Sequence, residues 1–313
     1  EPNDPNKQEN LEFMGFFDAW DINQGSEDVV IGIVDSGVDY RNDDLDDNLW
    51  VNQDEIPAGI KGTLDADSDG TVTSTEIKEW LQSNNNDFNF SGSVDLRDAL
   101  HSNSPLTDGN DTDGNDYTDD IFGWDFWASG TTFNTIRQDN DPVGDGSNHG
   151  THVAGIAAAE SDNGFGIAGT SLNATYMPVK AGGIPDDPAT PANESSQIGF
   201  GFNGIIYAAL NGADVINNSW GGSGGSQMEQ EIVNSFADLG VVIVASAGNA
   251  NSDGSIFPAA YYNVLSVGSV DFREGQQRRK SSFSNFGFDV DVFATGRLIR
   301  RTVFNNGFDM LSG

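Results

Sequence analysis

The chain contains five short runs of β-branched and other apolar residues, most of them followed by glycine or small polar residues. Such runs are typical of buried strands and the turns after them. They are VVIGIVDSG (29–37), ATYMPVKA (174–181), ADVINNS (213–219), GVVIVASAG (240–248) and NVLSVGSV (263–270). Helical patterns lie between them at 151–160, 198–212 and 227–240. Because strands that alternate with helices form a parallel sheet covered on both faces, the sequence predicts an α/β fold with functional loops at the strands' carboxyl ends.

One segment interrupts this alternation. From residue 52 to residue 107 the chain is polar and rich in Asn, Asp and Ser, with a single helical pattern at 75–82. Long irregular stretches inside a compact domain are usually functional or flexible. We therefore interpret 52–108 as an inserted loop region within one domain that spans 1–313.

The length and composition indicate a globular protein without a membrane span. The chain has 313 residues, of which 36% are hydrophobic, and no run approaches 18 apolar residues. The first ten residues, EPNDPNKQEN, lack the layout of a signal peptide, so any export signal is expected to have been removed or never present. A propeptide removed from the N-terminus is a possible partner.

The charge balance is strongly acidic, with 49 acidic against 14 basic residues and a net charge of −35. Binding to duplex nucleic acid is excluded, because contacts to its phosphates need Lys and Arg. The acidic residues can form either a solvating surface or a set of cation-binding sites. More than half of them lie between Asp35 and Asp145, where they often alternate with Gly and Asn. This pattern favours metal-binding loops for part of the charge.

Two motifs place residues capable of acid–base chemistry at the end of a predicted strand and at the start of a predicted helix. Asp35 follows the first strand, where it is either a loop carboxylate, the ribose-binding acid of a nucleotide fold, or a catalytic group. GIVDSG lacks the glycine spacing of a dinucleotide-binding loop. In SNHGTHVAGIAAA (147–159), His149 precedes a helix. The positive end of a helix dipole disfavours an imidazolium, and a general base has to be neutral.

Two further strands end in motifs suited to substrate binding. VINNSWGGSGG (215–225) places glycines after a strand, where they form either a plain turn or an edge that pairs with an extended peptide. VVIVASAGNAN (241–251) places Asn249 at a strand end. That residue is either a turn Asn or an amide donor to an oxyanion.

Taken together, IVDSGVD, NHGTHVAG, INNSWGG and ASAGN occur in an order that resembles the subtilisin-like serine proteases, or subtilases. The resemblance continues through 257–271 and 281–296 to the final LSG. It implies a three-layer subtilisin-like fold and polypeptide substrates. It further implies that Asp35 orients the imidazole, that His149 is the general base and that Asn249 donates to the oxyanion. The implied substrate-binding residues are Ser219, Trp220 and Gly221 in one cleft wall, Ala245, Ser246 and Ala247 in the primary pocket, and Ile256 at its base.

The family's nucleophile lies in a Gly-Thr-Ser-Met-Ala motif that opens a helix. LSG matches the residues just before its Thr-Ser, so Gly313 takes the place of the motif's glycine. We expect the catalytic Ser two residues after Gly313 and an incomplete catalytic domain in 1–313. The fragment alone is then expected to be inactive.

The segment DADSDGTVTSTE (65–76) fits the calcium-loop pattern D-x-D-x-D-G-x5-E without a mismatch. The preceding AGIKGTL (58–64) is not predicted to be helical, so we expect a single calcium loop rather than a paired EF-hand. The alternative is a chance match in an acidic chain. The expected ligands are Asp65, Asp67, Asp69, Thr71, Thr73 and Glu76.

Three more groups of oxygen ligands are expected to bind Ca²⁺. The second site lies in DGNDTDGNDYTDD (108–120), with Asp111, Asp113, Asn115, Tyr117 and Asp119 or Asp120. The third combines Asp125, Asp139 and Asp141. The fourth, implied by the family resemblance alone, uses Asp4, Asp44 and Asn163.

The hypothesis from the sequence is a secreted, bacterial, calcium-stabilised serine endopeptidase. Without Cys and with three His, a structural zinc site is excluded in favour of Ca²⁺, which is abundant outside cells. The alternative is a catalytically inactive calcium-binding or adhesion module with the same fold. The residue two positions past Gly313 distinguishes these hypotheses, since only Ser supports the enzyme.

Overall fold

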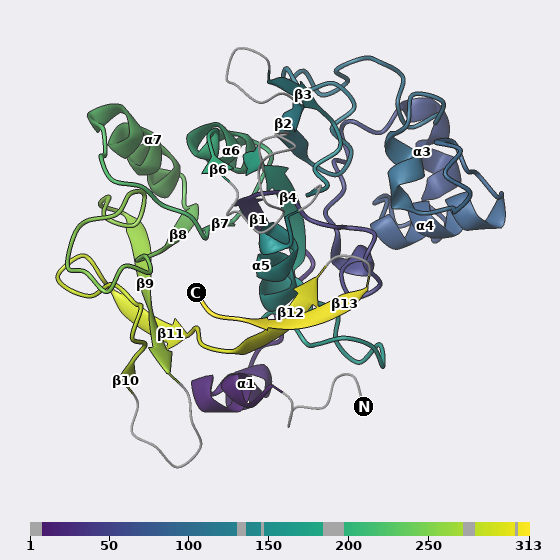
Figure 1. Ribbon diagram of the computed structural model, residues 1–313. Coiled ribbons are helices and arrows are strands. Elements are labelled where there is room, and N and C mark those ends of the chain that lie inside the picture. The colour runs from purple at the N-terminus through teal and green to yellow at the C-terminus, as the bar shows by residue number, and fades with distance from the viewer. Residues whose placement is uncertain (1–7, 130–135, 145–146, 184–196, 272–278, 304–305) are drawn as a thin grey trace.

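In the computed structural model, the described parts of the chain are residues 8–129, 136–144, 147–183, 197–271, 279–303 and 306–313. A mostly parallel sheet lies at their centre, in the order β10-β9-β8-β7-β1-β4-β2-β3, with β11 also paired to β9 (Figure 1). The antiparallel pairs are β2–β3 and β9–β10. The strands of this sheet are β1 (Val30–Asp35), β2 (Trp124–Ser129), β3 (Arg137–Asp139), β4 (Thr175–Lys180), β7 (Val215–Asn218), β8 (Val242–Ser246), β9 (Val264–Asp271), β10 (Arg279–Lys280) and β11 (Val292–Thr295).

Helices cover both faces of the sheet, because successive side chains of a strand point to opposite faces. Ile33 of β1 packs in one buried cluster with Val153, whereas its neighbour Val34 packs in another with Ile205 and Val233. The predicted three-layer α/β fold is therefore confirmed. The helices of these layers are α5 (His149–Ala158) on the first face and α6 (Gly201–Leu210) and α7 (Gln227–Asp238) on the second.

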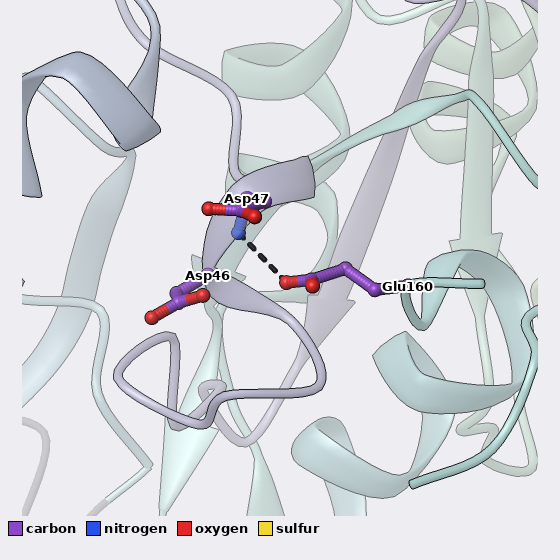
Figure 2. A group of neighbouring side chains, drawn as sticks. All are labelled: Asp46, Asp47 and Glu160. Carbon is purple, nitrogen blue, oxygen red and sulfur yellow. Dashed lines mark hydrogen bonds between the residues drawn. The ribbon is translucent and has the colours of Figure 1, made fainter. Parts of the chain in front are cut away.

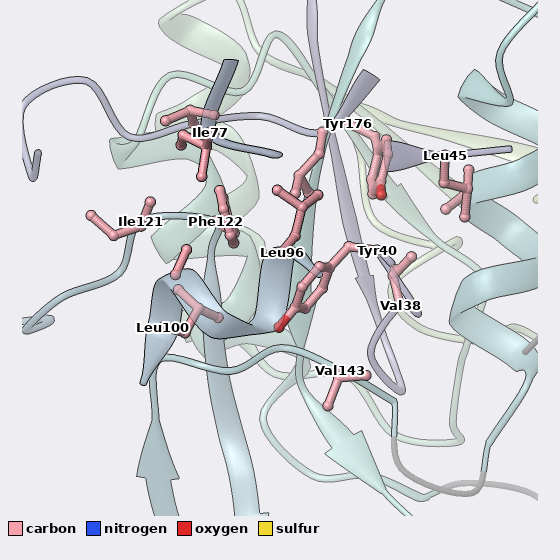
Figure 3. Close-up of a cluster of buried hydrophobic side chains, with 14 of the residues drawn as sticks. Val38, Tyr40, Leu45, Ile77, Leu96, Leu100, Ile121, Phe122, Val143 and Tyr176 are labelled. Carbon is pink, nitrogen blue, oxygen red and sulfur yellow. The ribbon is translucent and has the colours of Figure 1, made fainter. Parts of the chain in front are cut away.

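The segment 52–108 folds onto the first of these clusters. Ile77 and Leu96 are buried in it beside Tyr40 and Tyr176, which belong to the sheet-bearing part (Figure 3). The region therefore shares the core of the rest of the chain instead of lying on it as an irregular loop. Its elements are α3 (Ala58–Leu64), α4 (Ser74–Ser83) and η3 (Leu96–Leu100).

The prediction that AGIKGTL is not helical was wrong, because these residues form α3. Gly59 and Gly62 lower the helix propensity of the segment. Leu64 is fully buried and Ile60 packs against the same core, so tertiary packing compensates for the weak propensity.

The remaining elements flank the sheet. A two-stranded hairpin packs on α5, and the two-stranded β5–β6 sheet lies apart from the main one. No helix in the described ranges is long and apolar enough to cross a membrane. These elements are α1 (Glu9–Met14), α2 (Phe16–Trp20), η2 (Asp46–Asn48), β5 (Gly182–Gly183), β6 (Gln197–Ile198), β12 (Ile299–Val303) and β13 (Gly307–Leu311).

Candidate active site and cation-binding loops

Asp35 and His149 meet at the carboxyl end of β1. Nδ1 of His149 lies 2.7 Å from Oδ1 of Asp35, the oxygen that also accepts a hydrogen bond from the backbone N–H of Ser36. The Asp35 side chain is 1% exposed and the His149 side chain 48% exposed. A buried carboxylate thus contacts one ring nitrogen of an accessible imidazole, which is the arrangement needed to fix the tautomer of a general base.

The turn after β1 and the start of α5 bring these two residues together. A β-carbon on Gly150 would lie 2.2 Å from the carbonyl oxygen of Gly37, so only glycine fits there. The hydroxyl of Ser36 accepts a hydrogen bond from the N–H of Gly150 and lies 2.9 Å from the hydroxyl of Ser147. The helix begins at His149 itself, so its first residue carries the imidazole.

Asn249 lies in the loop after β8, and a second asparagine holds this loop. The Asn285 side chain is buried and donates from Nδ2 to the carbonyl oxygen of Ala247. Its Oδ1 accepts from the N–H groups of Ala250 and Ser252. Asn285 was not predicted as a site residue, although it lies in the family-like stretch SSFSNFG.

A cavity of about 480 Å³ connects these groups. His149, Ser246, Asn249 and Gly313 line it together with apolar side chains that include Val153 of α5 and Val267 of β9. Two of the predicted catalytic residues, His149 and Asn249, therefore face one space, and the buried Asp35 contacts His149 from behind it.

The predicted substrate-binding residues lie near this cavity. Ser219, Ala245 and Ser246 line it directly, and Trp220 and Gly221 follow Ser219. Ala247 and Ile256 line a smaller adjoining pocket that also includes Asn285. A β-carbon on Gly221 would lie 2.4 Å from Cγ2 of Ile256, and one on Gly248 would lie 3.3 Å from its Cγ1. The Ile256 side chain therefore lies between these two backbone segments.

The segment 65–76 forms a tight loop between α3 and α4. Carboxylate oxygens of Asp65, Asp67 and Glu76 lie within 4.8 Å of one another. Gly70 has a positive φ of 97°, as the sharp turn of such a loop requires, and Val72 is buried. The remaining predicted ligands stabilise the loop in other ways: the N–H of Thr71 donates to Asp69, and Thr73 caps α4 in a reciprocal pair with Glu76.

The structure brings two predicted ligands of the second site, Asp113 and Asp120, together with Glu55. Glu55 lies in the inserted segment, far from Asp113 and Asp120 in the sequence, and was not predicted as a ligand. Burial raises the pKa of Asp120 to about 7, although hydrogen bonds from Tyr207 and Asn115 lower it. Asp111 instead accepts backbone hydrogen bonds within its own loop, and Tyr117 packs its ring against Tyr207.

The third predicted group is not gathered into a carboxylate cluster among the described residues. Asp125 is a buried partner of Lys180, with Oδ2 2.8 Å from Nζ, and Asp139 is its register neighbour on β3. Asp141 accepts hydrogen bonds from Tyr40 and Arg97. Lys180 and Arg97 thus already form ion pairs with two of these three carboxylates.

Asp44 and Asn163, from the fourth predicted group, lie on neighbouring loops. Oδ2 of Asp44 accepts from the hydroxyl of Thr302, and burial raises the pKa of Asp44 to about 7. Asn163 donates to Glu160 and accepts from the N–H of Phe165. Asp4 lies outside the described residues.

An unpredicted acidic group lies beside these loops and is formed by Asp46, Asp47 and Glu160 (Figure 2). Glu160 accepts a hydrogen bond from the N–H of Asp47. Lys78 of α4 forms an ion pair with Asp46, so the inserted segment supplies a positive charge to this group.

The chain is similar to known proteases. It is 41% identical over 193 residues to a thermophilic serine proteinase from Bacillus sp. (strain AK1), which covers 62% of this chain and 43% of that protein. It is 39% identical over 193 residues to thermitase from Thermoactinomyces vulgaris, covering 62% and 61% of the two chains. The fold is similar to that of a protease from Pseudoalteromonas arctica, with a TM-score of 0.65, 23% identity, and coverage of 100% and 82%.

The aligned part accounts for less than two thirds of the length of either curated relative. A sequence profile of the Subtilase family matches residues 26–313. The chain therefore belongs to the subtilase family.

Proposed function

We propose that this chain carries most of the active site of a serine endopeptidase. The observation that supports this best is the contact between the buried Asp35 and the accessible His149, together with the cavity that His149 and Asn249 both line. In the proposed mechanism, Asp35 fixes the imidazole and stabilises its cation. His149 takes a proton from a serine hydroxyl as the hydroxyl attacks a peptide carbonyl, and later returns it to the leaving amine. The Asn249 amide donates to the oxyanion.

The nucleophile in this proposal is a Ser that follows Gly313 in the full-length protein. Gly313 lines the cavity with His149, and a β-carbon on it would lie 3.6 Å from Nδ2 of Asn249. A Ser close after Gly313 is thus near both the base and the oxyanion donor.

The proposed substrates are polypeptides that bind in extended form along Ser219, Trp220 and Gly221. The described structure gives these three residues no backbone hydrogen bond, so their N–H and C=O groups are available to a peptide strand. Ala245, Ser246 and Ala247 would line the primary pocket, with Ile256 limiting its depth. Comparable cleavage after large aromatic and after small residues would contradict this role of Ile256.

We also propose that Ca²⁺ stabilises the protein at two loops. The first is 65–76, where oxygens of Asp65, Asp67 and Glu76 already converge. The second uses Glu55, Asp113 and Asp120. Carboxylate-rich oxygen sites suit Ca²⁺, and millimolar calcium outside cells fits secretion by a bacterium. Residues 52–108 are then a calcium-binding insertion of the catalytic domain.

Labelling of the full-length protein with a fluorophosphonate probe, read by intact mass and peptide mapping, tests the activity. We expect one adduct, on a Ser just after Gly313, that is lost when His149 is replaced by Ala. Absence of an adduct on folded, calcium-loaded protein would contradict the enzyme and favour the inactive calcium-binding module.

A further inference from the structure

The indole of Trp220 lies against the backbone of Gly201, the first residue of α6. A β-carbon on Gly201 would lie 2.3 Å from Cη2 of the indole and 2.4 Å from its Cζ2. Non-bonded carbon atoms in a folded protein do not approach this closely, so an alanine at 201 and the observed indole position exclude each other.

Several contacts hold the indole in this place. Its Nε1 donates to the carbonyl oxygen of Val34 at 2.9 Å. The ring of Phe202 meets it edge-on, with centroids 6.0 Å apart and an angle of 83° between the rings. The indole is therefore pinned on one side by the strand that carries Asp35 and on another by α6, and it cannot rotate away from a new side chain without losing these contacts.

The backbone of Gly201 has no need of glycine. Its φ is not in the left-handed region, and it occupies a helical position where glycine lowers stability relative to alanine. Among the described residues, the atoms nearest to the missing β-carbon belong to Trp220 alone. The position of the indole thus explains why residue 201 is glycine. Gly201 leaves the space that the large Trp220 side chain fills.

The pair lies beside the edge proposed to bind substrate. Trp220 is the middle residue of Ser219–Gly221, whose backbone groups are free for an extended peptide. The missing side chain of Gly201 gives the indole room beside α6. If the indole were displaced from Gly201, it would lose its bond to Val34, or the backbone of Ser219–Gly221 that carries it would have to shift.

We propose that Gly201 is a positioning residue for substrate binding: it lets the Trp220 indole stay between α6 and the Val34 carbonyl, so that the backbone of Ser219–Gly221 keeps the position in which it can pair with an extended polypeptide of several residues. The inference rests on the proposed protease function for its substrate class. Gly201 lies outside the motifs predicted to form the cleft, and in this proposal it controls how tightly the extended part of a substrate binds.

The test is a double-mutant cycle in the full-length protein with Gly201→Ala, Trp220→Leu and the double variant. Each variant is assayed with a blocked tetrapeptide anilide and with a blocked single-residue ester. Binding of the matching uncleavable tetrapeptide amide is measured by calorimetry in a His149→Ala background, and Tm is measured for all variants.

We expect Gly201→Ala to raise KM and the peptide's Kd about tenfold, the scale of one lost hydrogen bond, with a smaller change in kcat and in ester hydrolysis. In the Trp220→Leu background the same substitution should have little effect, because leucine leaves room for a β-carbon. The Tm values and the contrast between peptide and ester hydrolysis separate the proposal from a folding defect.

Three results would overturn the inference. They are unchanged KM and Kd in Gly201→Ala, an equal loss in the Trp220→Leu background, or a matching fall of kcat on ester and peptide, which would mean that the substitution acts through Val34 and Asp35. If the wild type cleaves neither substrate but peptide binding follows the expected cycle, the protease proposal fails and the positioning role stands.

Discussion

Gly150 faces Gly37 so closely that a β-carbon on Gly150 would lie 2.2 Å from the Gly37 carbonyl oxygen and 3.2 Å from Cβ of Asp35. The start of α5 can approach β1 to this distance because residue 150 has no side chain. The 2.7 Å contact between His149 and Asp35 depends on that approach.

Replacing Gly150 by Ala should therefore separate α5 from β1. The obstacle is backbone and cannot rotate away, so we expect kcat/KM of the full-length protein to fall at least about 100-fold, the cost of misplacing a catalytic group by about 1 Å. Peptide hydrolysis and Tm are the measurements. Gly62→Ala is the control, because a β-carbon there meets nothing within 4 Å and should leave activity intact. Wild-type kinetics in Gly150→Ala would contradict the role of this contact.

Asp35→Asn should abolish most catalysis with little loss of fold. The amide keeps the shape of the carboxylate, but it can neither stabilise an imidazolium nor enforce the same tautomer, so we expect kcat to fall about 10⁴-fold. Asp18→Asn removes the same charge at an exposed position of α2 and serves as the control. A fall of less than tenfold would show that Asp35 is not the residue that orients the base.

Asn285→Ala should loosen the loop that carries Asn249. The substitution removes three hydrogen bonds of a buried side chain, to Ala247, Ala250 and Ser252. We expect the free energy of unfolding to fall by about 3 kcal/mol and kcat to fall with it. Urea unfolding and peptide kinetics measure these effects. Asn84→Ala, which removes one exposed bond to Trp80, should change neither by much.

Asp67→Asn should remove calcium stabilisation contributed by the loop 65–76. With Ca²⁺ at 100 times its Kd, one site adds about 2.7 kcal/mol to the free energy of unfolding, and losing a carboxylate ligand weakens that binding. The measurement is Tm with excess calcium and with EDTA. Glu79→Gln removes one charge from the exposed side of α4 and should keep the full calcium effect. An equal calcium response in both variants would exclude Asp67 as a ligand.

The stabilising effect of calcium should grow with pH. The folded-state pKa of Asp120 is raised to about 7 by burial, against about 3.9 in an unfolded chain. The folded state then binds more protons between these values, so without calcium this group makes stability fall as pH rises from about 4 to about 7. Ca²⁺ binds the ionised carboxylate, so it should raise Tm more near pH 8 than near pH 5.

Asp120→Asn should reduce this pH dependence, because its side chain does not ionise. The comparison is the difference in Tm with and without calcium, for wild type and variant at both pH values. A wild-type calcium effect that does not change with pH would argue against Asp120 as a ligand.

The sequence by itself determined five strands of the central sheet, the three helices that cover it and the strand-end positions of Asp35 and Asn249, but not β2, β3, β10 or β11. These features depend on short sequence segments, in which β-branched runs and helical periodicity can be recognised without knowledge of the tertiary structure. The family resemblance of NHGTHVAG and its neighbouring motifs placed His149 with them. The predicted strand at 29–37, for example, is β1, and the helical pattern at 227–240 is α7.

Only the tertiary structure decided which distant residues meet. It made a helix of AGIKGTL, because packing of Leu64 outweighs the weak propensity of two glycines. It joined Glu55 to Asp113 and Asp120, and it set Trp220 on Gly201. None of these contacts has a local signal, because each depends on how the whole core packs, and close packing is a property of all the side chains together.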